Sequence, residues 1–387
     1  MHFTLSEEQA MVREMAADFS DKVLRPGVME RERNGAFPRA AIAKAGELGL
    51  LGMLVPEEWG GAGLDTVSSA LALMEIARVC PSTAVTISVT NSVCAYPIWR
   101  FGTESQKQRY LRPLATGQIL GGFCLTEPQA GSDATNQRTR ARRDGNHYIL
   151  NGTKVWVTNA HVGKVFVVMA VTDPERRRGG ISAFIVTPDM PGFSFAAKEE
   201  KMGLRASATA SLILEDCLVP AENLLGQEGD GMRIPLHSLD GGRIGIAAQA
   251  VGIAAGAQNE ALRYARERTA FGRPLCELQA IRFSLADMET EIQAARLLTL
   301  RAAALRDRDP GAVGTAAAKA KLYASEMCNR VAYRAVQIHG GYGFSRDYPV
   351  ERFYRDARVT TLYEGTSEIQ RIVISRAVLA TDPGGEP

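Results

Sequence analysis

The stretch HYILNGTKVWVTNA, residues 147–160, decides the fold class. It is rich in β-branched and aromatic residues, and its pair Asn151-Gly152 is typical of a tight turn, so it predicts strand structure. Similar segments follow at residues 164–173, 181–188 and 210–220. Because no helical segments alternate with these segments, we do not expect a parallel nucleotide-binding sheet. The sequence instead predicts an antiparallel β-barrel or sandwich.

Helical patterns lie on both sides of this β region. Residues 1–120 contain apolar residues at helical spacing, interrupted by the glycine-rich loop VPEEWGGAGLDT at 55–66. Beyond residue 230 a long apolar stripe steps by threes and fours, as in a helix bundle. The fold class expected is therefore α+β and multi-domain. Its parts are an N-terminal helical domain (1–120), a middle antiparallel β-barrel or sandwich domain (121–230) and a C-terminal four-helix bundle (231–387).

The composition excludes several classes of protein. Hydrophobic residues make up 45% and charged residues 23% of the 387, and the net charge of +2 gives no reason to expect nucleic acid or a membrane surface as a partner. The six cysteines form no CxxC pair and the histidines no HExxH motif, so no metal site is expected. The N-terminus lacks the features of a signal peptide and no apolar run is long enough to span a membrane, so a cytoplasmic location is expected.

The usual nucleotide-binding motifs, GxGxxG and the P-loop, do not occur, so a nucleotide cofactor needs another kind of site. The loop FCLTEPQAGSDA, residues 123–134, has hydroxyl and backbone N–H groups that can bind carbonyl oxygens or phosphates. Most turns of this kind, however, bind no ligand. Trp156 and Thr158 share one strand face, where an indole and a hydroxyl can bind a flat heterocycle; a buried core Trp is the commoner role. The segments 268–275 and 337–344 add an Arg, a Phe and closely approachable glycines.

Glu364, in the stretch TLYEGTSEIQ at 361–370, is a lone carboxylate between an aromatic residue and a glycine. It is either a solvated or helix-capping acid, or a base whose pKa is raised by an apolar pocket. Ser367 and Gln370, three residues apart, predict a capping box for the helix that follows.

Taken in order, seven motifs resemble those of the acyl-CoA dehydrogenase family, from about residue 3 to about residue 380. They are TEPQAGSD, GTKVWVTNA, KMGLRASATASLILEDCLVP, RTAFGRPL, QIHGGYGF, RFYRDAR and YEGTSEIQR. LDGGRIGIAAQAVG, at 239–252, resembles the short-chain (butyryl-CoA) branch. The resemblance implies FAD-dependent α,β-dehydrogenation of an acyl-CoA to the trans-2-enoyl-CoA, with Glu364 as the base that removes the α-proton while the β-hydride passes to FAD. Electrons would then pass to electron-transferring flavoprotein.

The same resemblance implies roles for other residues. The segment Gln337 to Gly341 is expected to reach the cofactor from a neighbouring subunit, so that this segment and Arg268 meet one FAD from two different chains. That sharing implies a homotetramer built as a dimer of dimers. Residues matching cofactor contacts are Phe123, Leu125, Thr126, Gly131, Ser132, Trp156, Val157, Thr158, Arg268, Phe271, Gln279, Gln337, Gly340, Gly341, Thr366 and Glu368. Residues matching substrate contacts are Ser132, Asp240, Arg243, Gln249, Thr360 and Gly365, and no metal ligands are implied.

Three alternatives remain open at this point. The substrate could be an acyl group on a carrier protein, or an unusual branched acyl thioester of a biosynthetic pathway. The enzyme could be an oxidase that passes electrons to oxygen. A flavin-free scaffold derived from the family is the non-enzymatic alternative. Gln249 and Thr360 match the floor of the short-chain acyl pocket, so we expect a preference for acyl chains of about four carbons, because each unburied methylene forfeits about 0.8 kcal/mol.

Overall fold

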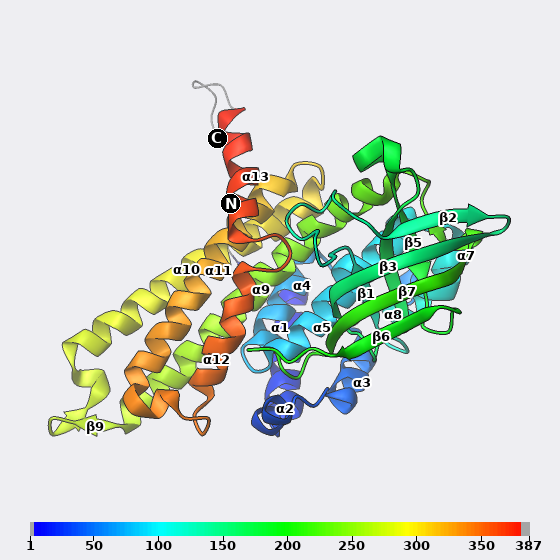
Figure 1. Ribbon diagram of the computed structural model, residues 1–387. Coiled ribbons are helices and arrows are strands. Elements are labelled where there is room, and N and C mark those ends of the chain that lie inside the picture. Colours follow the sequence, from blue (N-terminus) through cyan, green and yellow to red (C-terminus); the bar gives the residue numbers. More distant parts are fainter. Residues whose placement is uncertain (1–3, 381–387) are drawn as a thin grey trace.

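The computed structural model describes residues 4–380 and contains a helical part, a β-sheet and a second helical part in chain order (Figure 1). The predicted fold class is confirmed. The division at residues 120 and 230 stays a prediction, although the first strand begins at Gly121 and the first helix after the sheet at Arg233.

Within residues 4–380, eight α-helices precede the sheet. The first begins with a capping box, in which the Ser6 hydroxyl accepts from the Gln9 N–H and the Gln9 side chain accepts from the Ser6 N–H. The helices are α1 (Glu7–Phe19), α2 (Val28–Asn34), α3 (Arg39–Glu47), α4 (Thr66–Ala77), α5 (Pro81–Val89), α6 (Tyr96–Phe101), α7 (Glu104–Gln106) and α8 (Arg112–Ala115). A π-helical turn, η3 (Thr90–Ala95), joins α5 directly to α6.

The sheet has eight strands in the order β6-β7-β3-β2-β4-β5-β8, with β1 paired to β4. Its pairings are antiparallel except for β1 with β4 and β2 with β4, which are parallel, so the expectation of a purely antiparallel sheet was wrong at these two pairs. The strands are β1 (Gly121–Cys124), β2 (Arg140–Asp144), β3 (His147–Thr158), β4 (Val165–Val171), β5 (Ile181–Val186), β6 (Phe193–Lys198), β7 (Thr209–Pro220) and β8 (Leu224–Leu225).

Strands β4 and β5 are buried on both faces, which explains their continuous apolar runs. Val167 and Ile185 face Ile98 and Leu114 of the N-terminal helices. Phe166 and Phe184 face the opposite way, into a second core formed with β3 and β7. The sheet is therefore fixed against the N-terminal helices through its centre.

The C-terminal part contains three long helices, α9 (Arg233–Glu267), α10 (Gln279–Arg308) and α11 (Val313–His339), and two shorter ones, α12 (Pro349–Arg358) and α13 (Ser367–Leu379). A small hairpin, β9 (Thr269–Ala270) and β10 (Arg273–Pro274), follows α9, and the 3₁₀ turns η9 (Gly340–Phe344) and η10 (Val359–Thr361) flank α12. Both α12 and α13 contact α11, so together they take the fourth place in the expected bundle. The break between them carries Glu364.

Helix α9 lies at the centre of the molecule and contacts α4, α5, α10, α11 and α12. Its glycines allow close approach of backbones: a Cβ at Gly252 would lie 2.3 Å from the Met74 carbonyl oxygen of α4. Glycine in a helix interior costs about 1 kcal/mol relative to alanine, so close packing is the physical reason for this residue here.

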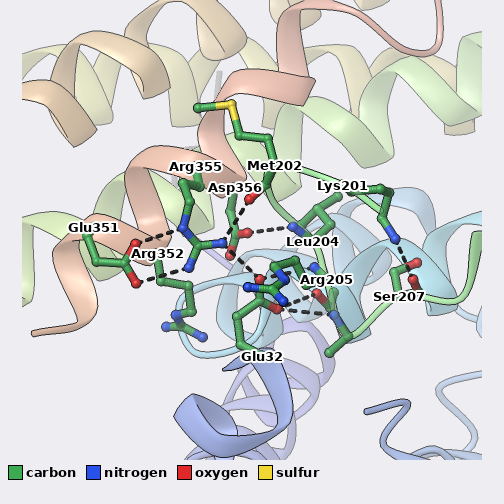
Figure 2. A network of polar contacts seen from close by, with 12 residues as sticks. Glu32, Lys201, Met202, Leu204, Arg205, Ser207, Glu351, Arg352, Arg355 and Asp356 are labelled. Carbon is green, nitrogen blue, oxygen red and sulfur yellow. Dashed lines mark hydrogen bonds and ion pairs between the residues drawn. The ribbon is translucent and has the colours of Figure 1, made fainter. Parts of the chain in front are cut away.

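A polar network joins all three parts of the chain around the segment between β6 and β7 (Figure 2). Asp356 of α12 accepts the backbone N–H of Leu204 at 2.6 Å, and Glu32 of α2 accepts that of Arg205 at 3.0 Å. Arg355 donates to Glu32 at 3.3 Å and to the Met202 carbonyl oxygen at 2.9 Å. Leu204, held in the left-handed region at φ 49°, is thereby pressed into an apolar cluster with Phe123 and Tyr363.

Three further observations bear on the sequence-based exclusions. None of the helices in residues 4–380 is both long and apolar enough to cross a membrane. The same residues contain no group of three His, Cys, Asp or Glu side chains placed to hold a metal ion. All six cysteines fall within this range and are unpaired.

Candidate active site

Glu364 lies in the turn between η10 and α13 with φ 53°, a left-handed conformation that costs a non-glycine residue about 1–2 kcal/mol. Gly365 follows with φ 87°. The predicted capping box is wrong by one residue: Thr366 is the N-cap and its hydroxyl accepts from the Ile369 N–H. The Gln370 side chain instead donates to the carbonyl oxygens of Glu364 and Gly365, at 3.2 and 2.9 Å.

Glu364 is partly exposed as a residue, but its Oε2 atom is buried without a hydrogen-bond partner. Burial raises its pKa from 4.5 to about 7, against the opposing effect of the nearby cations Arg243 and Lys321. A carboxylate with this pKa can take up a proton near neutral pH.

Gly242 of α9 provides the space for this carboxylate. A Cβ at Gly242 would lie 2.4 Å from Glu364 Oε2 and 2.9 Å from its carboxyl carbon, so no larger residue fits without displacing this carboxylate. The following residue, Arg243, pairs with Asp240 through a 2.8 Å hydrogen bond. Burial raises the pKa of Asp240, although Arg243 opposes that shift.

The predicted acyl-pocket residues are buried near the base. Gln249, seven residues after Gly242 and so on the same face of α9, donates to the Pro81 carbonyl oxygen at 2.9 Å and accepts from the Tyr363 hydroxyl at 2.5 Å. Thr360 in η10 is fully buried and donates to the Ala357 carbonyl oxygen at 2.7 Å. Tyr363 and Thr360 belong to the same short segment as Glu364, so Gln249 and Thr360 reach the base region from two elements.

The middle domain carries the predicted flavin-side residues. Trp156 and Thr158 point to the face of β3 opposite the buried Val157, and the Trp156 side chain is 60% exposed in the single chain. Trp156 has φ 60° beside a register shift in the β3–β7 pairing, so its conformation is that of a bulge and not of a regular strand. An exposed indole on a distorted strand excludes the ordinary buried-core role.

The loop after β1 is held against β3 by a buried ion pair that sequence reasoning missed. Lys154 Nζ lies 2.7 Å from Glu127 Oε1 and also donates to the Leu125 carbonyl oxygen, while the Val155 N–H donates to the Thr126 carbonyl oxygen. Burial acts to raise the pKa of Glu127, but the charge of Lys154 and the hydrogen bonds to this carboxylate hold it down to about 2. The available signal was a lysine at an inward-facing strand position. In the same region Phe123 is partly buried, whereas Gly131 and Ser132 are exposed.

A third group of predicted residues lies at the far end of the bundle. The β9–β10 hairpin carries Phe271, which is 92% exposed, and the Arg268 guanidinium lies 5.4 Å from the ring of Tyr342 in η9. A Cβ at Gly340 or Gly341 would meet no atom within 4 Å. Within one chain this end is remote from the sheet (Figure 1). Gln279 and Gln337 are also exposed, as is Glu368 in the first turn of α13, next to the Glu364 turn.

The structure thus brings together Glu364, Arg243, Gln249 and Thr360 near α9, but leaves Trp156 and Arg268 apart. Sequence profiles of a single family match almost the whole chain: the acyl-CoA dehydrogenase N-terminal domain over residues 6–118, the middle domain over 122–217 and the C-terminal domain over 229–379. The chain belongs to the acyl-CoA dehydrogenase family. It is therefore a member of a family of flavin-dependent oxidoreductases, and the resemblance stated from its motifs is confirmed.

Individual acyl-CoA dehydrogenases are similar over their full length. The mitochondrial short-chain specific acyl-CoA dehydrogenase of Mus musculus is 49% identical over 375 residues, which are 97% of this chain and 91% of the mouse protein. The structure of butyryl-CoA dehydrogenase from Megasphaera elsdenii superposes with a TM-score of 0.96 at 45% identity, covering 98% of this chain and 100% of that one. A chain in the structure described for the electron transferring flavoprotein of Acidaminococcus fermentans gives 0.97 at 50% identity, with the same coverage.

Proposed function

We propose that this acyl-CoA dehydrogenase oxidises a short-chain acyl-CoA to the trans-2-enoyl-CoA and passes the electrons to electron-transferring flavoprotein. The observation that carries the proposal is the Glu364 carboxylate, buried, unpaired at Oε2 and with a pKa of about 7. An α-proton next to a thioester is weakly acidic, so a base poised near neutral pH suits its removal. The names of the mouse and Megasphaera relatives support the short acyl chain.

The residues around Glu364 have separate tasks in this proposal. The Glu364 carboxylate takes up the α-proton, and no hydrogen bond competes for its Oε2 atom. Gly242 leaves room for the carboxylate, and burial of the site excludes water that would otherwise solvate the ionised form. Asp240, Arg243, Ser132 and Gly365 are the proposed contacts to the acyl-CoA.

The residues present fit FAD. The exposed Trp156 indole and the Thr158 hydroxyl form a surface for a flat ring system, while Arg268, Phe271 and the open Gly340–Gly341 backbone suit a diphosphate and its nucleoside. Bound FAD supplies the acceptor for the hydride from the β-carbon.

We also propose that each cofactor is bound by two chains. Arg268 lies beside η9 in the same chain, so the hairpin and the Gln337 to Gly341 segment would bind the cofactor together. One chain would then supply this end of the bundle to a cofactor site, and a second chain would supply the strand that carries Trp156. This differs from the expectation that Arg268 and Gln337 come from different subunits. A homotetramer built as a dimer of dimers satisfies the arrangement.

Gln249 and Thr360 are the proposed floor of the acyl pocket, and they set the preferred chain at about four carbons. Replacing both by glycine, Gln249→Gly with Thr360→Gly, should move the optimum of kcat/KM toward longer chains, measured from C4 to C12 acyl-CoAs. Gln258→Gly, further along α9, is the matched control for loss of helix propensity and should leave the profile unchanged. A wild-type optimum at C8 or longer contradicts the pocket.

The most direct test of the whole proposal is anaerobic bleaching of the flavin by a panel of thioesters. We expect butyryl-CoA to bleach the purified enzyme rapidly and electron-transferring flavoprotein to restore its colour faster than oxygen does. If only acyl groups bound to a carrier protein bleach the flavin, the substrate is a carrier-bound acyl group and not an acyl-CoA. If oxygen restores the colour faster than electron-transferring flavoprotein does, the enzyme is an oxidase. Absence of bleaching by every thioester would overturn the proposed activity.

A further inference from the structure

Lys321 of α11 is a fully buried lysine close to the base, and the family resemblance gave it no role. Its Nζ donates to the carbonyl oxygen of Gly365 at 2.7 Å, the residue directly after Glu364. Lysine is almost never fully buried without a partner, because an ammonium loses much solvation free energy on burial. A single carbonyl contact is modest compensation for that loss, so a role for the charge itself is indicated.

The Gly365 carbonyl belongs to a turn with two successive left-handed residues. Such a backbone persists only where surrounding contacts hold it. Lys321 from α11 and Gln370 from α13 both donate to this carbonyl oxygen, at 2.7 and 2.9 Å. The direction of the Glu364 side chain therefore depends on two donors that converge on its neighbour.

Lys321 also acts on the base through its charge. It is one of two cations, with Arg243, that favour the ionised form of Glu364 against burial. Burial, assisted by Arg243, lowers the pKa of Lys321 to about 8, while Glu364, Glu326 and Glu368 oppose that shift. Arg243 is paired with Asp240, whereas no carboxylate lies within ion-pair distance of Lys321 in residues 4–380, so its charge is not neutralised by direct contact.

We propose that Lys321 is a positioning residue for the dehydrogenation: its hydrogen bond fixes the Glu364–Gly365 turn, and its positive charge favours the ionised base. The inference rests on the proposed function, because it assumes that Glu364 removes the α-proton. It assigns one buried side chain to two separable effects, orientation of the base and control of its protonation.

The test compares Lys321→Met with Gln370→Leu in the holoenzyme. Methionine matches the lysine side chain as far as Cε but lacks the charged Nζ, whereas Gln370→Leu removes the second donor without changing any charge. For Lys321→Met, the acidic limb of the kcat–pH profile should move to higher pH by about one unit, the lower end of the effect of a nearby opposite charge. Its plateau should fall about ten- to hundred-fold from misplacement of the base. Gln370→Leu should lower the plateau and leave the limb in place.

An acidic limb of Lys321→Met at the wild-type pH overturns the inference, even if the variant is less stable, since a merely structural lysine would not move it. Lys321→Arg retains the charge and should keep the wild-type limb; a shifted limb in that variant also contradicts the proposal. Glu364→Gln, assayed in parallel, distinguishes failure of the proposed base from failure of the proposed role of Lys321. If it retains turnover, the proposed base is wrong; if it is inactive while the Lys321→Met limb does not move, only the role of Lys321 fails.

Discussion

Glu364 combines two costs in one residue, a left-handed backbone and a carboxylate with a buried oxygen that has no hydrogen-bond partner. The second cost depends on pH. The folded-state pKa of about 7 exceeds the ordinary value of 4.5, so the folded protein binds this proton more tightly than the unfolded chain does. The contribution to stability is therefore present below pH 4.5 and is lost as the pH rises through 7. At alkaline pH the ionised Glu364 carboxylate destabilises the fold.

Glu364→Gln should separate activity from stability. Turnover should fall by about 10²–10⁴ because general-base catalysis is lost. At pH 8 the free energy of unfolding should rise by up to about 3 kcal/mol relative to wild type, since the pKa shift of Glu364 is worth about 1.4 kcal/mol per unit, and the gain should vanish near pH 4. Urea unfolding of the holoenzyme at both pH values measures this, with the exposed Glu200→Gln as control. A variant less stable than wild type at pH 8 would contradict the assignment.

Helix α9 contributes to the site through Gly242, whose missing side chain leaves room for the Glu364 carboxylate. Gly242→Ala should increase helix propensity by about 1 kcal/mol yet lower kcat about ten- to hundred-fold, because the new methyl group displaces the carboxylate. Gly314→Ala in α11, where the nearest atom to a Cβ is 3.7 Å away, is the matched control and should retain full turnover. Steady-state kinetics with flavin content as the check decides between them; full activity of Gly242→Ala would refute the geometry.

The elements differ in how far the sequence could predict them. Strands β3, β4, β5 and β7 and the stripe of α10 were predicted because their composition and apolar periodicity are local, whereas β6 was not predicted. The parallel pairing of β1 with β4 could not be predicted, because pairing between segments distant in the sequence leaves no periodic pattern. Thr366 was missed as a cap because Ser367 beside it is an equally good cap residue. Lys321 and Gly242 were missed as partners of the base because each lies far from Glu364 in the sequence.

The network of Glu32, Arg355 and Asp356 fixes the positions of the three parts of the molecule relative to one another (Figure 2). That network places the β6–β7 segment against Tyr363, next to the base. The sheet and the α12–α13 break are thus kept at a fixed separation, as a site assembled from two domains requires. The hairpin end of the bundle lies outside this contact and faces away from the sheet.

Arg268→Ala should therefore weaken FAD retention and oligomer stability together, because a ligand bound between two chains stabilises their association. Flavin content after gel filtration and the thermal midpoint of the oligomer measure the two effects. Arg266→Ala, an exposed arginine at the end of α9, is the control and should change neither. Loss of FAD from an oligomer of unchanged thermal stability would exclude the shared site.

The proposed division of each cofactor site between two chains, with Trp156 on one and Arg268 on the other, has a genetic consequence. Two alleles, one damaged at Glu364 and the other at Arg268, each encode an inactive protein when expressed alone. In a mixed dimer, one site contains the damaged Glu364 of one chain and the damaged Arg268 of the other. The second site contains the intact Glu364 and the intact Arg268. A cell that carries both alleles would recover part of the activity, whereas two alleles damaged on the same half would not. Complementation between alleles would thus map the residues to the two sides of the cofactor without any structure of the assembly.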